Sequence, residues 1–168
     1  MSGHDSALLE VEGMMQRQMK QMVHLVDDLL DVSRVSTGKI ILRKKRVELG
    51  QVLKEAQETV QAAVVDKGQR LIMHLPPGPV PMHADPTRLV QVFANLLNNA
   101  SKFSYLEGRI EVSAKVEDGQ VCVAVRDEGV GIAAPALTRI FDLFSQVDSS
   151  LARNTSGLGI GLTLVTDL

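Results

Sequence analysis

The chain is poor in the residues that bind nucleic acids or cross-link small secreted proteins. Its 168 residues include no tryptophan, one tyrosine and one cysteine, and the formal net charge is −2. Without aromatic platforms or a basic excess, the sequence does not favour nucleic acid as its main partner. Cys122 lies in an alternating apolar segment, which predicts a small core residue in a reducing compartment rather than half of a disulfide.

Long apolar runs are also missing. No segment approaches the length of a membrane span, and the first residues lack the charged and then apolar order of a signal peptide. We therefore expect a cytoplasmic chain that makes no membrane contact itself, although a parent protein can be membrane-anchored. A hydrophobic content of 45% is sufficient for a packed core and predicts one domain with an appendage, or one irregular domain.

The appendage is a predicted N-terminal helix with apolar residues at heptad spacing. The residues in each row are seven apart. One row is Leu8, Met15, Met22 and Leu29, and the other is Val11, Gln18, Leu25 and Val32, in which Gln18 is the one polar residue. Further apolar residues widen this stripe beyond a two-stranded seam, as in a helical bundle. Because one helix cannot bury so broad a stripe, we expect either a partner chain, as in a homodimer formed through this helix, or a further helix that lies upstream in the parent protein.

The sequence predicts three parts: the helix at 1–38, a linker at 39–48 and a folded domain at 49–168. The linker contains four consecutive basic residues at 43–46, which we interpret as solvated surface. The domain is predicted to begin with an amphipathic helix over 50–66 and a short strand over 71–75. A proline-rich turn region follows.

A second helix is predicted to begin at Asp85 and Pro86, because Asp caps free N–H groups and the fixed φ of proline suits the first helical position. Its core face is predicted to contain Val92, Phe93, Leu96, Leu97, Ala100 and Phe103. Asn95, Asn99 and Lys102 share one flank of this helix. Amide oxygens beside one cation can hold hydrated Mg²⁺ and its phosphates. Taken alone, a solvated polar face is the commoner explanation of such a flank.

Two alternating segments downstream predict strands joined by a hairpin. Ile110, Val112, Ala114 and Val116 alternate with polar residues, as do Val121, Val123 and Val125, and Asp118-Gly119 between them is a turn signal. We expect an α+β fold: a two-layer α/β sandwich of helices on one face of a sheet of antiparallel strands.

The second strand leads into a loop suited to a flat ring. Asp127 can accept a hydrogen bond from an exocyclic amine, and Gly129 and Gly131 let the backbone approach closely. Phe141 and Phe144 lie three residues apart and are predicted to be core anchors that hold one end of the next loop.

The polar segment 145–156 lacks periodicity, so we expect a mobile lid. It leads to glycines that alternate with apolar residues and open a helix, a pattern that presents free N–H groups to phosphate oxygens. This segment is Gly157, Leu158, Gly159, Ile160, Gly161 and Leu162.

Together, these segments resemble the ATP-binding domain of sensor histidine kinases. Residues 85–104, 127–132, 141–144 and 157–162 are similar to its N, G1, F and G2 boxes, in order. The heptad helix, with its segment 25–34, resembles the second helix of the family's dimerisation and phosphotransfer domain.

The resemblance implies ATP and Mg²⁺ as cofactors and assigns residues to them. Asn95, Asn99 and Lys102 would contact the metal and phosphates, with Asn99 as the metal ligand. Phe103 stands where the family often has tyrosine, so a contact through a phenolic hydroxyl is lost. Asp127 would receive the adenine amino group. The other expected nucleotide contacts come from the G1, F and G2 boxes: Gly129, Gly131, Ile132, Phe141, Phe144, Gly157, Leu158, Gly159, Gly161 and Leu162.

The resemblance also implies a reaction. Gyrase-type and mismatch-repair ATPases share the boxes but place a general-base glutamate where Asn95 stands, and an amide cannot take a proton from water. The expected function is therefore a protein histidine kinase: phosphoryl transfer from ATP to a histidine, then to an aspartate on a response-regulator receiver domain. The alternative is a degenerate kinase-like dimerisation and binding module that makes little use of ATP.

The family's acceptor histidine has no counterpart here. His4, His24, His74 and His83 lack the flanking pattern and are predicted to be surface or packing residues. We therefore expect that this chain does not phosphorylate itself. Because the sequence ends inside the last predicted helix, we also expect an uncovered sheet edge and weak nucleotide binding.

Overall fold

The computed structural model of the chain describes residues 11–16, 18, 19, 22, 23, 26, 41–145 and 159–167. The chain divides into two compact units, Met1–Ile40 and Ile41–Leu168. In the first unit the described residues are helical, and their apolar side chains are exposed: Val11, Met14, Met15, Met19, Met22, Val23 and Val26. A helix with an apolar stripe was predicted for this segment, whereas Leu8, Leu25, Leu29 and Val32 of the heptad rows lie outside the described residues.

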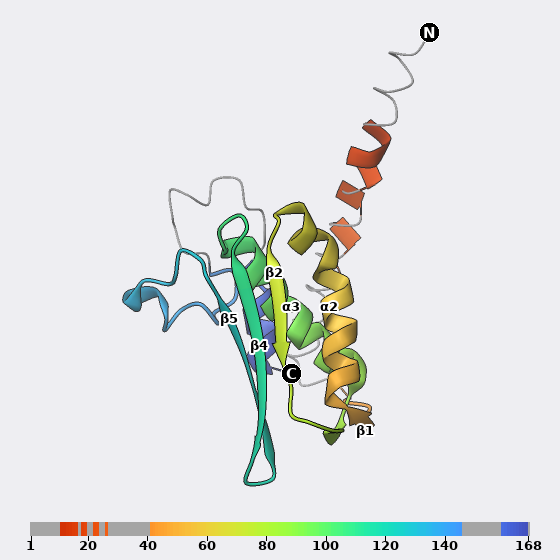
Figure 1. The fold of residues 1–168 in the computed structure, drawn as a ribbon. Helices are drawn as coiled ribbons and strands as arrows, with labels where there is room; N and C mark the ends of the chain where they lie inside the picture. Colours follow the sequence, from red (N-terminus) through yellow and green to blue (C-terminus); the bar gives the residue numbers. More distant parts are fainter. Residues whose placement is uncertain are drawn as a thin grey trace. The chain divides into compact units, whose positions relative to one another are not determined.

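The second unit contains a sheet of three strands in the order β2–β4–β5 (Figure 1). Strand β2 (Arg70–His74) pairs in parallel with β4 (Arg109–Glu117), and β4 pairs in antiparallel fashion with β5 (Gln120–Asp127). The sheet is therefore mixed, and the prediction of antiparallel strands was wrong for β2. The hairpin prediction was correct: Asp118 and Gly119, with φ of 50° and 74°, form the two-residue turn between β4 and β5.

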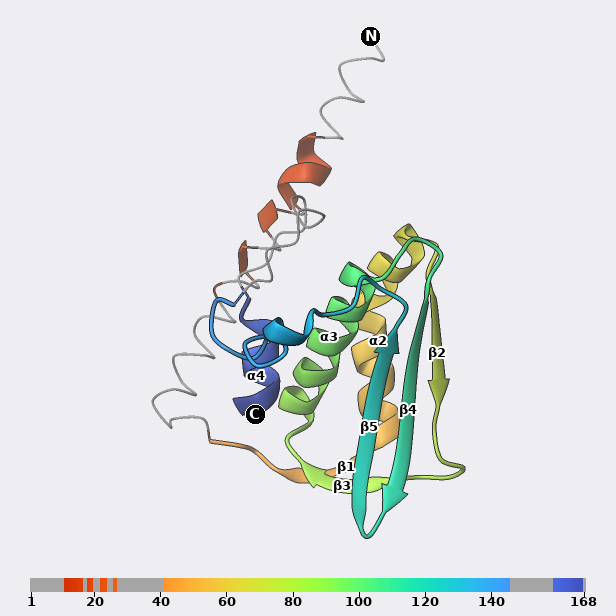
Figure 2. The ribbon, with the colours of Figure 1, turned by 90° about the vertical axis from the view of Figure 1, so that its left-hand side faces the viewer.

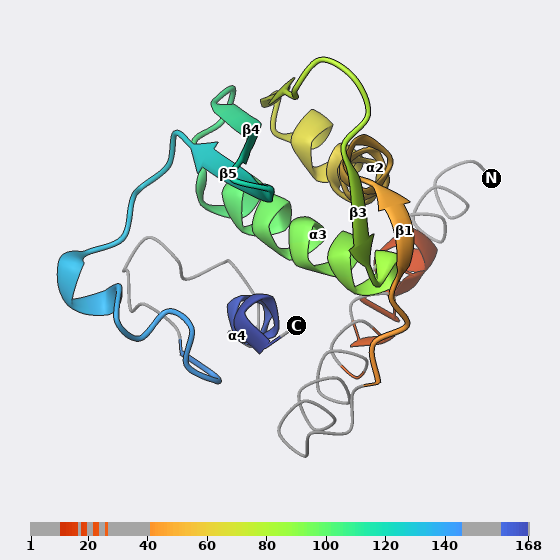
Figure 3. The same cartoon turned by 90° about the horizontal axis from the view of Figure 1, so that it is seen from below.

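Helices α2 (Leu49–Asp66) and α3 (Pro86–Phe103) cover one face of this sheet (Figures 1 and 3), as predicted. Helix α3 begins as its sequence indicated, with Asp85 accepting hydrogen bonds from the N–H groups of Thr87 and Arg88 at 3.1 and 3.3 Å. The short helix α4 (Gly161–Asp167) lies beside α3 (Figure 2). A 3-10 turn, η1 (Ala134–Ala136), precedes it in the chain.

A second, two-stranded sheet lies at the N-terminal ends of α2 and α3 (Figure 2). It pairs β1 (Lys45–Glu48) with β3 (Pro81–Ala84) in antiparallel fashion. Neither strand was predicted: β1 lies in the expected linker and β3 follows the expected proline-rich turn. Glu48 links the start of α2 to the segment before β3, because its carboxylate accepts hydrogen bonds from Val80 N at 3.1 Å and Gln51 N at 2.9 Å. These backbone donors lower the pKa of Glu48.

The hydrophobic core lies between the helices and the inner face of the sheet. Its fully buried members include Leu49, Leu53, Val60, Leu97, Ile110 and Val112. Residues alternate between the two faces of a strand, so Val121, Val123 and Val125 of β5 pack against the core while Cys122 points away from it. Cys122 is exposed, and the prediction that it is a core residue was wrong.

Phe103 was also predicted to be a core residue, and this prediction was wrong. It is the last residue of α3, and it is 40% exposed. His74 and His83 are exposed, as predicted, whereas His4 and His24 lie outside the described residues. No helix in the described part of the chain combines the length and the apolar character that crossing a bilayer requires.

Candidate functional site

The flank of α3 predicted to bind phosphates faces α4. Asn95 is half-buried, and its Nδ2 donates a hydrogen bond to the carbonyl oxygen of Gly161 at 3.3 Å. Residues 95 and 161 are far apart in the sequence, so this bond brings the N box and the G2 box into direct contact. Asn99 and Lys102 follow along the helix and are also half-buried.

The end of α3 is joined to the G1 box by backbone hydrogen bonds. Ser104 and Gly129 form an isolated antiparallel bridge. On either side of it, the N–H of Val130 donates to the carbonyl oxygen of Phe103, and the N–H of Tyr105 donates to that of Glu128, both at 3.3 Å. The N box and the strand end that carries Asp127 are therefore parts of one hydrogen-bonded structure.

Gly129 is required by the closeness of this junction. A Cβ atom at Gly129 would overlap the carbonyl oxygen of Phe103 and would lie 2.6 Å from Asp127 Oδ1. Gly131, in contrast, has a φ of +68° and open space around its Cα. The first glycine allows close backbone approach and the second allows a left-handed conformation, so the two serve different physical purposes.

Glu128 holds the G1 box from its other side. Its carboxylate accepts hydrogen bonds from the backbone N–H of Arg109 and from the Arg109 guanidinium, both at 3.1 Å. Arg109 also pairs with Glu111 at 3.3 Å. The backbone hydrogen bond from Arg109, followed by its side-chain bond, lowers the pKa of Glu128. Glu128 therefore fixes the loop, while Asp127 is exposed beside it.

The backbone of the F box contacts the helix that follows the G2 box. The hydroxyl of Thr163 on α4 donates to the carbonyl oxygen of Phe141 at 2.8 Å. Gly159 has a φ of +71°, and a Cβ atom there would lie 2.5 Å from the carbonyl oxygen of Ser145. Phe141 and Phe144 are 43% and 59% exposed, so the prediction that they are core anchors was wrong.

Lys102 has an electrostatic environment that suits an anion. Burial lowers its pKa, and the nearby positive charge of Lys67 lowers it further. The ammonium group also lies 4.8 Å from the centroid of the Phe103 ring. A phosphate near Lys102 would offset both the burial of its charge and the repulsion from Lys67.

Two further residues at this site were not predicted from the sequence. Lys67 and Gln69, in the connection between α2 and β2, donate hydrogen bonds to carbonyl groups at the end of α3. Their partners are distant in the sequence, and neither residue belongs to a recognisable motif.

Several predicted site residues remain separate from these contacts. Ile132 is exposed in the G1 loop, and Leu162 is half-buried on α4. Gly157, Leu158 and most of the predicted lid at 145–156 lie outside the described residues. Within the described ranges, no group of three or more His, Cys, Asp or Glu side chains is placed to hold a metal ion.

Comparison with known proteins agrees with this arrangement. Residues 84–168 match the family described as histidine kinase-, DNA gyrase B-, and HSP90-like ATPase. The chain is 32% identical over 148 residues to sensor histidine kinase RcsC of Salmonella typhimurium, covering 88% of this chain and 16% of that protein. It is 32% identical over 161 residues to the signal transduction histidine-protein kinase BarA of Escherichia coli, covering 91% of this chain and 17% of that protein. The chain thus spans a small part of these relatives.

Solved structures show the same fold. Full-length ShkA in complex with AMPPNP superposes with a TM-score of 0.76 at 29% identity, over 92% of this chain and 32% of that one. The histidine kinase AdeS of Acinetobacter baumannii has a TM-score of 0.68 at 23% identity, over 92% and 70% of the two chains. The similarity to AdeS concerns the fold alone. With its family match covering half of the sequence, the chain belongs to the histidine kinase-, DNA gyrase B-, and HSP90-like ATPase family.

Proposed function

We propose that this chain is the ATP-binding catalytic part of a two-component sensor histidine kinase. The observation that carries the proposal is the junction between α3 and the G1 loop. There, backbone hydrogen bonds from Val130 to Phe103 and from Tyr105 to Glu128 join the Asn99 flank to the strand end that bears Asp127. An adenine at Asp127 and phosphates at Asn99 and Lys102 would occupy one continuous site.

Each residue has a distinct role in the proposal. The Asp127 carboxylate accepts a hydrogen bond from the exocyclic amine of adenine, and Lys102 pairs with phosphate oxygens. Asn99 supplies a neutral oxygen to Mg²⁺, which suits a hard cation held mainly by phosphates and water. Bound Mg²⁺ would neutralise charge on the transferring phosphate. Because the described residues offer no acidic cluster, the ion and the nucleotide would bind together.

Asn95 favours transfer over hydrolysis. Its amide group donates to the Gly161 carbonyl oxygen and has no basic atom that could deprotonate water. ATP held by this chain would therefore be retained for an acceptor histidine located elsewhere in the parent protein or in a partner. A response-regulator aspartate would receive the phosphoryl group next, and the reaction would take place in the cytoplasm, where ATP is available.

The N-terminal unit supplies the proposed dimer contact. Its described methionine and valine side chains are exposed within this one chain, and all of them except Met14 belong to the predicted apolar stripe. A second copy that covers this stripe would form a helical bundle, which is the arrangement that heptad spacing favours. Methionine suits such an interface because its flexible side chain fills irregular gaps.

Calorimetric titration with Mg²⁺ and AMPPNP tests the proposal. We expect one saturable site, abolished by Asp127→Ala and accompanied by thermal stabilisation, because a ligand of the folded state raises apparent stability. Incubation with labelled ATP should release no phosphate and leave His24 unlabelled. Labelled His24 would refute the predicted lack of autophosphorylation. The absence of any nucleotide binding would refute the proposal and favour the degenerate binding module.

A further inference from the structure

The carbonyl end of α3 is held by side chains instead of by a glycine cap. Helix ends leave backbone carbonyls without partners, and many helices close with a glycine in the left-handed conformation. Here Ser104 follows the helix with extended backbone angles. The Lys67 ammonium donates to the carbonyl oxygens of Ser101 and Lys102 at 2.6 and 3.0 Å. A cation at this position also interacts favourably with the helix dipole.

Gln69 makes the second and more buried part of this cap and is only 7% exposed. Its Nε2 donates to the carbonyl oxygens of Ser101 at 3.0 Å and Tyr105 at 3.1 Å, with a longer contact of 3.5 Å to Ser104. Its Oε1 accepts a hydrogen bond from the Ser101 hydroxyl at 2.7 Å. One side chain therefore fixes both the last turn of α3 and the residues that follow it.

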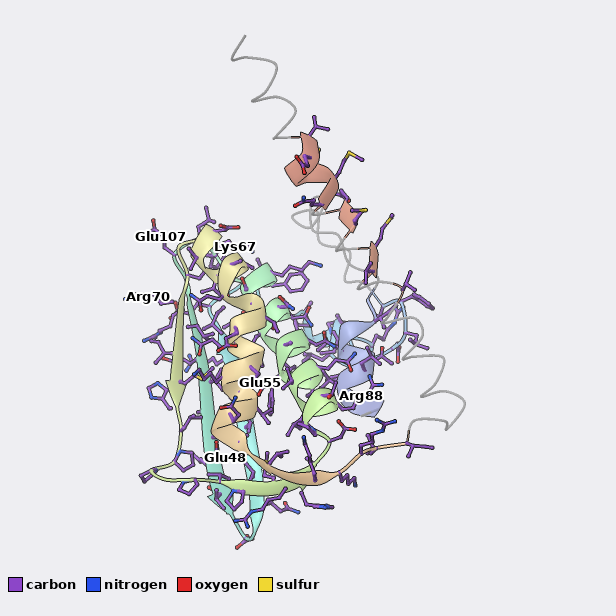
Figure 4. The ribbon with its side chains drawn as sticks, turned by 90° about the vertical axis from the view of Figure 1, so that its right-hand side faces the viewer. Glu48, Glu55, Lys67, Arg70, Arg88 and Glu107 are labelled. Carbon is purple, nitrogen blue, oxygen red and sulfur yellow. The ribbon has the colours of Figure 1, made fainter. Side chains whose placement is uncertain are left out.

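The residues fixed in this way are those that bond to the G1 loop. Phe103 and Tyr105 make the backbone hydrogen bonds to Val130 and Glu128, and Ser104 bridges to Gly129. A change in the direction in which the chain leaves α3 must therefore move the G1 loop relative to the helix. Figure 4 places Lys67 at the end of α2 beside Glu107, whose N–H donates to the Lys67 carbonyl oxygen at 2.9 Å. This backbone bond anchors the cap on the α2 side.

We propose that Gln69, supported by Lys67, is a positioning residue that sets the distance between the phosphate-binding and adenine-binding halves of the nucleotide site. The inference rests on the proposed function, because it concerns the same ligand. ATP gains affinity when both halves engage it at once, and this gain is lost when their spacing is wrong. Adenosine needs only the half at Asp127, and tripolyphosphate needs only the half at Asn99 and Lys102.

Gln69→Met tests the inference, because it keeps the side-chain length and removes all of the hydrogen bonds. We expect affinity for ATP with Mg²⁺ to fall about tenfold or more, whereas affinity for adenosine or tripolyphosphate should change less than about twofold. Val52→Ala is the control: this buried residue lies in the first part of α2, remote from the cap, and its truncation destabilises the same core. It should leave the ratio of ATP to adenosine affinity unchanged.

Lys67→Met provides a milder variant if Gln69→Met does not fold, and should reduce ATP affinity about threefold. Lys67→Arg keeps a cationic donor and should restore most of that loss. Equal losses for ATP and adenosine, or a ratio matching that of Val52→Ala, would refute the positioning role while leaving the proposed function intact. If the unaltered chain bound no ATP, the proposed function would be wrong and this inference would fall with it.

Discussion

The two walls of the nucleotide site are attached to the protein in different ways. The wall formed by α3 and the G1 loop is joined by hydrogen bonds between backbone groups, and α3 itself is part of the hydrophobic core. In the wall formed by the F box and α4, Thr163 bonds to the Phe141 carbonyl oxygen and Asn95 of α3 bonds to the Gly161 carbonyl oxygen. The buried side chains of this wall, Ile160 and Leu164, lie outside the main core cluster. The first wall is thus tied to the stability of the whole domain.

Because the two walls are attached differently, substitutions in them should affect nucleotide binding and the stability of the domain to different extents. A change in the backbone junction of the first wall should disturb both nucleotide binding and folding, because the same backbone contacts serve both. A change in the second wall should disturb binding with a smaller cost in stability, because this wall lies outside the main core cluster and its hydrogen bond to α3 comes from one side chain. Substitutions at matched glycines and polar residues test this contrast directly.

The largest effect is expected for Gly129→Ala. The new methyl group would overlap the carbonyl oxygen of Phe103, so the junction must separate. We expect a loss of about 3 kcal/mol of unfolding free energy, measured by urea denaturation, together with loss of AMPPNP binding. Gly131→Ala is the control in the same loop: its surroundings are open and only its φ of +68° is unfavourable, so about 1 kcal/mol should be lost. Equal losses would contradict the proposed role of the junction.

Gly159→Ala should weaken nucleotide binding more than it lowers stability. The Cβ atom would lie 2.5 Å from the Ser145 carbonyl oxygen, which forces the F box away from α4. We expect AMPPNP affinity to fall at least about tenfold, while the unfolding free energy falls by only about 1–2 kcal/mol. Calorimetry and urea denaturation of the same sample measure both quantities. A stability loss as large as that of Gly129→Ala would show that the two walls are equally part of the core.

Asn95→Ala should have a smaller effect on stability. It removes the hydrogen bond to the Gly161 carbonyl oxygen, which is worth about 1 kcal/mol. Amide hydrogen exchange should become faster in α4 and remain unchanged in β4. Asn98→Ala is the matched control, because Asn98 is exposed on the same helix. Faster exchange in α4 of both variants would mean that helix propensity, rather than this contact, explains the change.

The smallest expected effect is a pH-dependent change in stability when Asp85 is replaced. The N–H of Arg43 donates to its carboxylate at 2.8 Å, and this bond is the main reason that the pKa of Asp85 is lowered. A lowered pKa in the folded state gives stability that is fully present above the ordinary value of about 4 and is lost as the pH falls through the lower folded value.

Asp85→Asn keeps a capping oxygen but removes the charge, so it should cost about 0.5 kcal/mol at neutral pH. Thermal denaturation should show this difference shrinking below about pH 4. Glu58→Gln, on the exposed side of α2, controls for the loss of one negative charge. A difference that persisted unchanged at low pH would contradict the pKa argument.

Local signals in the sequence predicted much of the fold. The start of α3 could be predicted because Asp85 and Pro86 act within the same turn, and the β4–β5 hairpin because Asp118 and Gly119 specify their own turn. Strands β1 and β3 have four residues each and pair across more than thirty intervening positions, so no local pattern indicated them. The parallel direction of β2 likewise depends on tertiary packing.

The site was predicted less completely than the fold. The Asn flank and the G1 glycines follow motifs, whereas Gln69 acts through carbonyl groups that any residue can supply, so its partners cannot be recognised from sequence. Cys122 was misassigned because alternation identifies two faces but does not by itself exclude a small apolar residue from the outer one. Phe141 and Phe144 were misassigned because aromatic spacing indicates a shared face without showing what covers it.

The most direct test of the central claim is an NMR titration of the isotope-labelled chain with Mg²⁺ and AMPPNP. The claim is that α3 and the G1 loop together form one nucleotide site. We predict that the side-chain amide of Asn99 and the backbone amides of Asp127, Gly129 and Gly131 shift together along one saturation curve. Shifts confined to one of these two segments, or centred elsewhere in the domain, would contradict it.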